Sequence, residues 1–244
     1  MSLAALSQAI ASTPNPVVST DLFDTVLLRD HTTETQRLAK AARRAGVLLG
    51  VDPDVVVKLR WTCHDSAYRA VAMERPGGEA TLQAICRTMA SAMGLDDRAA
   101  AVLLDTEVSV DIEHLRANRR LTAVLRRART AGARVVAVSD TYYSGRELRR
   151  ILNAVVGDAP IDAVYSSADL GRTKHAGGIF DLVAEAEAVP VSRILHVGDD
   201  HPADVVRARA ASWVPIHLPR GGAYRAVATT GRVLGMPSRL RRLR

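Results

Sequence analysis

The sequence predicts an α/β fold: a doubly wound, Rossmann-like parallel sheet with an α-helical segment inserted after its first strand. Short apolar runs alternate with helix-length stretches, a pattern typical of parallel strands joined by helical crossovers. The runs are apolar along their whole length, as expected when helices cover both faces of a sheet. With 244 residues, 48% of them hydrophobic, the chain can bury such a core.

Five apolar runs are predicted to form the sheet. They cover residues 17–20, 135–138, 163–165, 194–197 and 213–216. The last run contains Pro215, which has no backbone N–H to donate and therefore favours an edge strand. Helices are predicted between the runs, at residues 121–131, 145–155, 178–188 and 203–211. Ligands of such folds bind beyond the carboxyl ends of the strands.

The interval between residues 31 and 115 contains no convincing strand and is predicted to form an inserted helical module. Its apolar residues recur at helical spacing, as Ile85 and Met89 do. We therefore predict a Rossmann-like core formed by residues 1–30 and 116–244, and a helical cap formed by residues 31–115.

Charge and cysteine content narrow the class of protein. The net charge is +7, yet aromatic residues make up only 4% of the chain, so a nucleic-acid partner is not expected. The basic segment at residues 239–244 is interpreted as a solvated end. Two cysteines without metal-type spacing indicate neither a disulfide framework nor a zinc site. No apolar run reaches the roughly 20 residues of a membrane span, so a cytoplasmic protein is expected.

Polar residues gather where three of the predicted strands end. They are Asp21, Asp24 and Thr25 after the first strand, Ser139 and Asp140 after the second, and Asp199, Asp200 and Asp204 after the fourth. Taken singly, each could have a local role, such as capping a helix. Because the carboxyl ends of parallel strands meet at one edge, together they predict an oxygen-rich site suited to a hard cation such as magnesium.

The order and spacing of these residues resemble the haloacid dehalogenase superfamily of hydrolases over nearly the whole chain. Val-Val-Ser-Thr-Asp21-Leu-Phe-Asp-Thr25 resembles the first motif, and Val-Ser139-Asp resembles the second. Lys174, in Gly-Arg-Thr-Lys-His-Ala-Gly-Gly, resembles the third, and Val-Gly-Asp-Asp through Asp204 the fourth. In this superfamily a helical insert between the first two motifs is a type 1 cap, which excludes water and selects the substrate.

The resemblance implies a phosphatase that acts on a small phosphorylated metabolite, such as a sugar phosphate. Asp21 would attack phosphorus and form an aspartyl phosphate. Thr25, Ser139 and Lys174 would complete the catalytic set, with Ser139 and Lys174 holding the phosphoryl oxygens. Lys174 is one of only three lysines in the chain, which favours this role over that of a solvated loop residue.

The resemblance also implies a magnesium cofactor. The expected ligands are the carboxylates of Asp21 and Asp199 and the backbone carbonyl of Phe23. Asp200 or Asp204 would bind the ion directly or through water.

Four residues are predicted to line the substrate site: Phe23, Asp24, Arg29 and Asp140. Phe23 departs from the family pattern, because superfamily phosphatases carry an aspartate there that protonates the leaving group. Such general acid catalysis is typically worth about 10²–10⁴-fold in rate. Asp24 could replace that acid, or it could brace the loop through backbone amides. Arg29, at the predicted hinge, could reach an anionic group or pair with a carboxylate.

Two other functions stay open at this point. The haloacid dehalogenases themselves carry an aromatic residue at the offset of Phe23, which makes a metal-free 2-haloacid dehalogenase one alternative. A non-catalytic module that binds a phosphorylated ligand is the other. Adjacent carboxylates at Asp199 and Asp200 would repel each other without a cation, so they favour the metal-dependent phosphatase.

Overall fold

The computed structural model describes residues 3–221, so the basic segment at residues 239–244 lies outside the described part of the chain. The chain forms two compact units. The first comprises the residues up to 28, residues 70–81 and residues 116–219, and the second is built mainly from residues 29–69 and 82–115. Within residues 3–221, no helix is long and apolar enough to cross a membrane.

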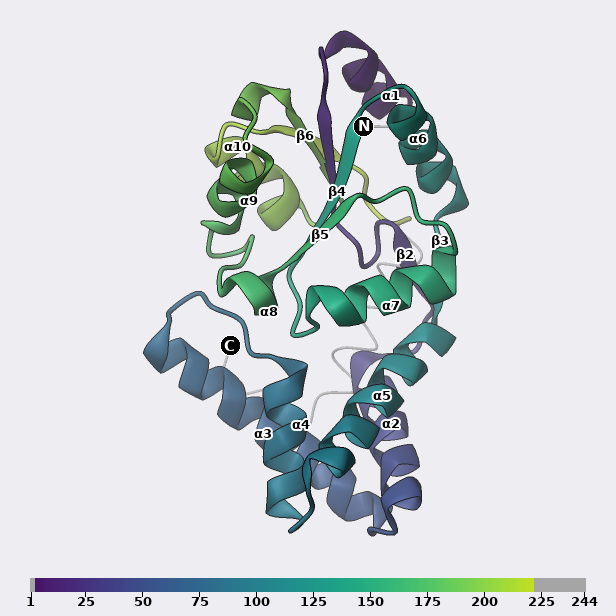
Figure 1. Cartoon of the computed structure of the whole chain (residues 1–244), viewed down its shortest axis with the longest axis vertical. Coiled ribbons are helices and arrows are strands. Elements are labelled where there is room, and N and C mark those ends of the chain that lie inside the picture. The colour runs from purple at the N-terminus through teal and green to yellow at the C-terminus, as the bar shows by residue number, and fades with distance from the viewer. Residues whose placement is uncertain (1–2, 222–244) are drawn as a thin grey trace. The chain divides into compact units, whose positions relative to one another are not determined.

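A five-stranded parallel sheet forms the centre of the first unit (Figure 1). In spatial order its strands are β5 (Ala163–Ser166), β4 (Arg134–Ser139), β1 (Val17–Thr20), β6 (Ile194–Gly198) and β7 (Val214–His217). All neighbouring pairs are parallel. The predicted sheet is therefore confirmed, and β7, which contains Pro215, lies at an edge as predicted.

Helices cover both faces of the sheet. α1 (Leu3–Ser12) and α6 (Arg119–Thr130) lie on one side, and α9 (Ile179–Glu187) and α10 (Ala208–Ala210) lie on the other (Figure 1). The unit also contains α7 (Gly145–Val156), α8 (Ser167–Leu170), the 3-10 helix η1 (Val191–Arg193) and the π-helix η2 (His201–Arg207). The helix predicted at residues 203–211 is thus partly a π-helix, which is wider than an α-helix.

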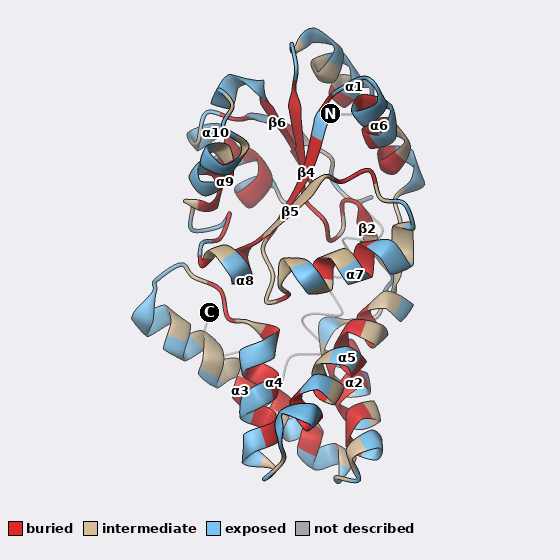
Figure 2. Ribbon diagram, in the orientation of Figure 1, coloured by how far each residue is buried: buried red, intermediate tan, exposed pale blue. Residues whose placement is uncertain are grey.

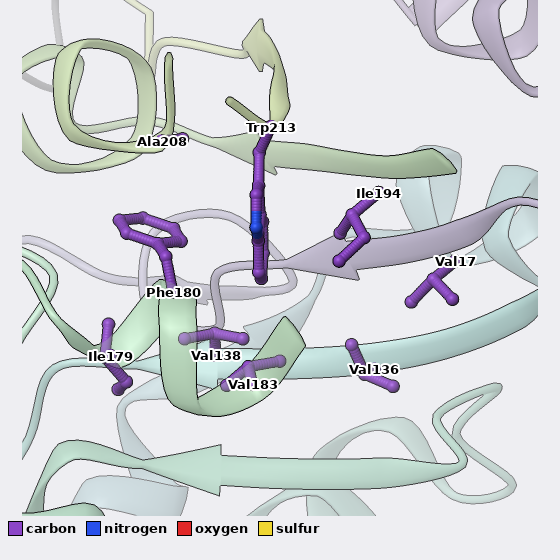
Figure 3. Packing of buried hydrophobic residues seen from close by; sticks show 9 residues of the cluster. All are labelled: Val17, Val136, Val138, Ile179, Phe180, Val183, Ile194, Ala208 and Trp213. Carbon is purple, nitrogen blue, oxygen red and sulfur yellow. The ribbon is translucent and has the colours of Figure 1, made fainter. Parts of the chain in front are cut away.

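A buried apolar cluster joins the sheet to α9 and α10. Its members are Val17, Val136, Val138, Ile179, Phe180, Val183, Ile194, Ala208 and Trp213 (Figure 3). Every residue of β1 and β6 is buried, and Figure 2 marks both strands as parts of the unit's interior. Burying a side chain of this size contributes about 1.5–3 kcal/mol, so the central strands are held firmly in place.

The second unit is a helical bundle inserted between β2 (Leu27–Arg29) and β3 (Leu115–Ala117), two short strands that pair with each other. Its helices are α2 (Glu34–Leu49), α3 (Pro53–Glu74), α4 (Leu82–Ala92) and α5 (Asp97–Glu113). The predicted helical insert is confirmed. Two buried ion pairs link its helices, Arg37 with Asp111 at 2.8 Å and Arg60 with Glu107 at 2.6 Å.

Residues 70–81, at the end of α3 and before α4, pack with the first unit. The Thr173 hydroxyl donates to the carbonyl oxygen of Gly77 (3.2 Å), and the Ser167 hydroxyl donates to the buried carboxylate of Glu79 (3.1 Å). Gly77 has a φ of +77°, and a Cβ there would lie 2.6 Å from the Cβ of Ala176. Only glycine fits this close approach.

Candidate active site

The residues predicted from the first motif lie in a tight turn at the carboxyl end of β1. The backbone N–H of Asp21 donates to the carbonyl of Val197 in β6 at 2.9 Å, which ties the turn to the sheet. The Leu22 carbonyl then accepts from the N–H of Leu27 at 2.8 Å, and Asp24 adopts a φ of +63°. A non-glycine residue in this left-handed region is strained, and such strain is common at functional sites.

The ammonium group of Lys174 lies between two buried carboxylates. Its Nζ is 2.7 Å from Oδ1 of Asp21 and 2.7 Å from Oδ1 of Asp204. Burial alone would lower the pKa of Lys174, but the charges of Asp21 and Asp204 raise it above its ordinary value. The lysine is therefore charged and aimed at the predicted nucleophile.

Both carboxylate oxygens of Asp204 are engaged. Besides Lys174, its Oδ1 lies 3.0 Å from Nε2 of His196, and its Oδ2 accepts the backbone N–H of Asp200 at 3.0 Å. Burial alone would raise the pKa of Asp204, but Lys174 and His196 hold it well below the ordinary value of an aspartate. Asp204 is thus an ionised carboxylate fixed from three sides.

Asp21, Asp199 and Asp204 form a cluster that could hold a metal ion, since they offer carboxylate oxygens within 4.8 Å of one another. Burial, followed by the charge of Asp21, raises the pKa of Asp199 to about 7. Burial also raises the pKa of Asp21, although Lys174 opposes this shift. Hard oxygen ligands and repulsion among like charges both suit a divalent cation, so these residues fit the predicted magnesium site.

Two predicted residues end β4, with different surroundings. Ser139 is 1% exposed, and its hydroxyl is buried without a hydrogen-bond partner among the described residues. Asp140 accepts the backbone N–H of Lys174 (2.7 Å) and of His175 (3.1 Å). Asp140 therefore fixes the loop that carries the lysine, while Ser139 retains a donor for another group.

The other predicted residues take varied positions. Thr25 donates a long hydrogen bond of 3.4 Å to Asp199. Asp200 accepts from the backbone N–H at residue 203 (3.2 Å) and so caps η2. Phe23 is 8% exposed, and the centroid of its ring lies 6.1 Å from that of Tyr143. Arg29 ends β2 and belongs to the second unit, so its contact with a substrate stays a prediction.

Sequence reasoning missed Ser19 and His196. His196 contacts Asp204 of the carboxylate cluster, and Ser19 contacts His196. Ser19 Oγ is 2.8 Å from Nδ1 of His196, and both residues are fully buried. His196 interrupts an otherwise apolar strand, and Ser19 follows two buried valines in β1. That interruption was a usable signal, because a buried polar group is costly unless a partner satisfies it.

Fold and site together define a Rossmann-like enzyme with a helical insert and an acidic centre at the carboxyl edge of its sheet. The chain belongs to the haloacid dehalogenase-like hydrolases, whose family profile matches residues 18–212. The predicted family is therefore confirmed. No curated protein sequence matches the chain significantly.

Solved structures share the fold at low sequence identity. A 2-haloacid dehalogenase from Pseudomonas syringae pv. Tomato DC3000 is 20% identical with a TM-score of 0.56, over 82% of this chain and 84% of that one. An L-2-haloacid dehalogenase from Xanthobacter autotrophicus is 18% identical (TM-score 0.54, 92% and 84% covered). A haloacid dehalogenase-like family hydrolase from Xanthomonas campestris is 12% identical (TM-score 0.51, 92% and 93% covered).

Proposed function

We propose that the chain is a magnesium-dependent phosphatase that hydrolyses a small phosphomonoester, such as a sugar phosphate, through an aspartyl phosphate at Asp21. The observation that carries this proposal is an excess of negative charge at the site. The carboxylates of Asp21, Asp199 and Asp204 lie close together, and the ammonium of Lys174 pairs with two of them, Asp21 and Asp204. A metal-free dehalogenase has no use for such an excess, whereas a phosphatase can neutralise it with a bound cation.

Each residue would supply a distinct part of the reaction. The Asp21 carboxylate attacks phosphorus as the bond to the leaving oxygen breaks, and water then cleaves the aspartyl phosphate, releasing inorganic phosphate. Lys174 stabilises charge on the phosphoryl oxygens. Asp21, Asp199 and the Phe23 carbonyl would hold magnesium, with Asp200 or Asp204 nearby. When bound, the ion supplies further neutralisation of the phosphoryl group.

The Ser139 hydroxyl supports a ligand with oxygen acceptors. An unsatisfied buried polar group costs about 1–3 kcal/mol, and a phosphoryl oxygen would satisfy this one. In the apolar interior of the sheet the same hydroxyl would bring only a cost. Ser139 is therefore proposed as a phosphoryl-binding residue.

Phe23 affects which substrates the enzyme turns over well. Its ring packs near Tyr143 and carries no proton for a leaving group. The charge of Asp24 contributes to the raised pKa of Asp199, which puts Asp24 within electrostatic reach of the site. We propose that Asp24 either supplies the missing proton or braces the loop. In the second case, substrates with good leaving groups would react fastest.

The test is phosphate release from a panel of sugar phosphates, nucleotides and an aryl phosphate, with magnesium or with EDTA. We expect turnover that EDTA abolishes and that Asp21→Asn lowers on the order of 10⁴-fold. Asp54→Asn is the matched control, because Asp54 is an exposed residue of the bundle and should leave turnover unchanged. The leaving group of the aryl phosphate needs little protonation. Its turnover should therefore depend on the nucleophile Asp21 but not on a general acid at the position of Phe23.

Two outcomes would favour the rivals. Phe23 and the fold shared with 2-haloacid dehalogenases make halide release from 2-halo acids worth measuring in EDTA. Such release, without phosphatase activity, would replace the proposal by the metal-free dehalogenase. Folded protein that binds magnesium and phosphate but turns over no substrate would instead be a phospho-ligand binding module.

A further inference from the structure

A serine and a histidine lie side by side in the interior of the sheet. Ser19 of β1 and His196 of β6 are register partners in a parallel pair. Each lies two residues after a member of the apolar cluster in Figure 3, Val17 and Ile194 respectively, so their side chains point to the same face, toward α9. Neither was predicted as a site residue, and neither has a part in the proposed reaction so far.

Two aromatic side chains pack edge-on against the His196 ring. Its centroid lies 5.4 Å from that of Phe180 and 5.9 Å from that of Trp213. An apolar side chain would fill this space without the cost of burying two ring nitrogens. Both nitrogens have partners: Nδ1 is 2.8 Å from the Ser19 hydroxyl and Nε2 is 3.0 Å from Asp204. The polarity of the ring therefore serves these two contacts.

The partners determine where the hydrogens lie. An ionised carboxylate can only accept, so Nε2 of His196 carries the hydrogen that faces Asp204. In the neutral imidazole Nδ1 is then an acceptor, and the Ser19 hydroxyl donates to it. Hydrogen bonds thus fix the ring at both edges and in one tautomer.

We propose that His196, fixed by Ser19, is a positioning residue for Asp204. Asp204 in turn holds Lys174 against the nucleophile, because its Oδ1 binds both the imidazole (3.0 Å) and the ammonium (2.7 Å). The Lys174 ammonium then reaches Asp21 at 2.7 Å. A continuous line of hydrogen bonds runs from the interior of β1 to the residue that attacks phosphorus. This inference rests on the proposed function.

The packing around Asp204 leaves little room for its carboxylate to move. A Cβ on Gly198 would lie 2.1 Å from Oδ2 of Asp204, so the carboxylate presses against the end of β6. Its other oxygen is held by the imidazole. Because the Lys174 ammonium binds that same oxygen, loss of the imidazole donor should change how Asp204 holds Lys174.

Two amide substitutions separate a positioning role from simple packing. Glutamine in His196→Gln places an amide nitrogen near the position of Nε2 and can still donate to Asp204, whereas asparagine in His196→Asn reaches only the position of Nδ1. With magnesium and an aryl phosphate, we expect kcat to fall about 10–100-fold in His196→Asn and no more than about threefold in His196→Gln, with a smaller change in KM. Ser19→Ala should lower kcat about two- to tenfold.

Trp213→Phe is the matched control, because Trp213 packs on the His196 ring but takes no part in the hydrogen bonds that lead from Ser19 to Asp21. It should lower the melting temperature and leave kcat within about twofold. Equal losses in His196→Gln and His196→Asn, or a loss of kcat in Trp213→Phe as large as in His196→Asn, would overturn the proposal.

A second readout needs no turnover. Two-dimensional ¹H–¹⁵N correlation spectra of the wild-type imidazoles, without metal or substrate, should find the Nε2–H tautomer at His196. The Nδ1–H tautomer would overturn the proposal even if the histidine variants fail to fold. If the wild type hydrolysed no phosphate ester, the proposed function would fall, while this spectrum would still decide the contact with Asp204.

Discussion

The two units bury charge in opposite ways. In the helical bundle each buried arginine faces its own carboxylate, Arg37 with Asp111 and Arg60 with Glu107, and the charges balance. At the carboxyl edge of the sheet, three carboxylates cluster around one site, two of them share the ammonium of Lys174, and the charges do not balance. A balanced pair needs nothing more, whereas an unbalanced cluster is stable only when a ligand or protons complete it. This difference distinguishes structural charges from those of a site.

Breaking a balanced pair should have the largest effect on stability. Glu107→Ala leaves the 2% exposed Arg60 without its main partner, and we expect a loss of about 3–5 kcal/mol of unfolding free energy. Urea denaturation would measure it. Glu113→Ala on the same helix is the control, because this half-exposed carboxylate pairs with surface cations and should contribute about 1 kcal/mol or less. Similar losses in both variants would remove the distinction between the buried pair and the surface pair.

Removing a charge from the unbalanced cluster should act in the opposite direction. In EDTA above pH 7, Asp199→Asn is expected to stabilise the protein by about 2 kcal/mol. The folded protein keeps a proton on Asp199 up to about pH 7, whereas the unfolded chain releases it near pH 3.8. Wild-type stability therefore falls as the pH rises through this window, and the gain in the variant should vanish below pH 4. Thermal unfolding in EDTA at pH 4, 6 and 8 would measure both the gain and its disappearance.

The neighbouring residue provides the control for that change. Asp200→Asn keeps a good helix cap at a partly exposed position and should change stability by no more than about 0.5 kcal/mol. Destabilisation by Asp199→Asn at pH 8 would mean that repulsion between Asp199 and the neighbouring carboxylates does not lower the stability of the wild type.

Close packing at the cluster predicts an effect of comparable size on stability. In Gly198→Ala the new Cβ would lie 2.1 Å from Oδ2 of Asp204, which we expect to cost about 1–3 kcal/mol and to lower turnover through displacement of the carboxylate. Gly221→Ala is the control, because no atom of the described residues lies within 4 Å of a Cβ there. Urea denaturation and aryl phosphate turnover would be measured together. Normal turnover in Gly198→Ala would mean that Asp204 can move without consequence.

The smallest expected effect is on metal affinity. Because the pKa of Asp199 is raised to about 7, a magnesium ion held by Asp199 would have to displace a proton below that pH. Affinity should therefore be about tenfold weaker at pH 6 than at pH 8. Isothermal titration calorimetry of the wild type and of Asp199→Asn would measure it, and the variant should lose most of the pH dependence. A flat profile in the wild type would exclude Asp199 from the metal site.

Most of the fold could be predicted because buried parallel strands and helical crossovers leave strong local patterns. The run at residues 17–20 matches β1, and the proline in β7 correctly marked an edge. Helix α1 was not predicted, since its sequence has no charged residue in its first or last turn to mark its ends. The π-helix η2 was expected as an α-helix, because widening of a turn depends on tertiary contacts rather than on local spacing.

The site residues that belong to sequence motifs could be predicted. The residues that meet only through the register of two strands were missed. Asp21, Lys174 and Asp204 were named from the sequence, and the structure brings them within hydrogen-bonding distance. Ser19 and His196 lie 177 positions apart and meet only through the β1–β6 register. The sequence could mark each of them as a polar residue in a buried strand, but it does not give the register, so their pairing could not be predicted without the fold.

The segment formed by residues 70–81 has a consequence for protein engineering and for evolution. It lies within the helical insert in sequence but belongs to the sheet unit, where Glu79 is the buried acceptor for Ser167. An exchange of the whole insert between relatives would remove this acceptor and leave the buried hydroxyl to its other acceptor, the Thr141 carbonyl at 3.2 Å. The pieces that can be transplanted are residues 29–69 and 82–115, and residues 70–81 should be inherited together with the sheet.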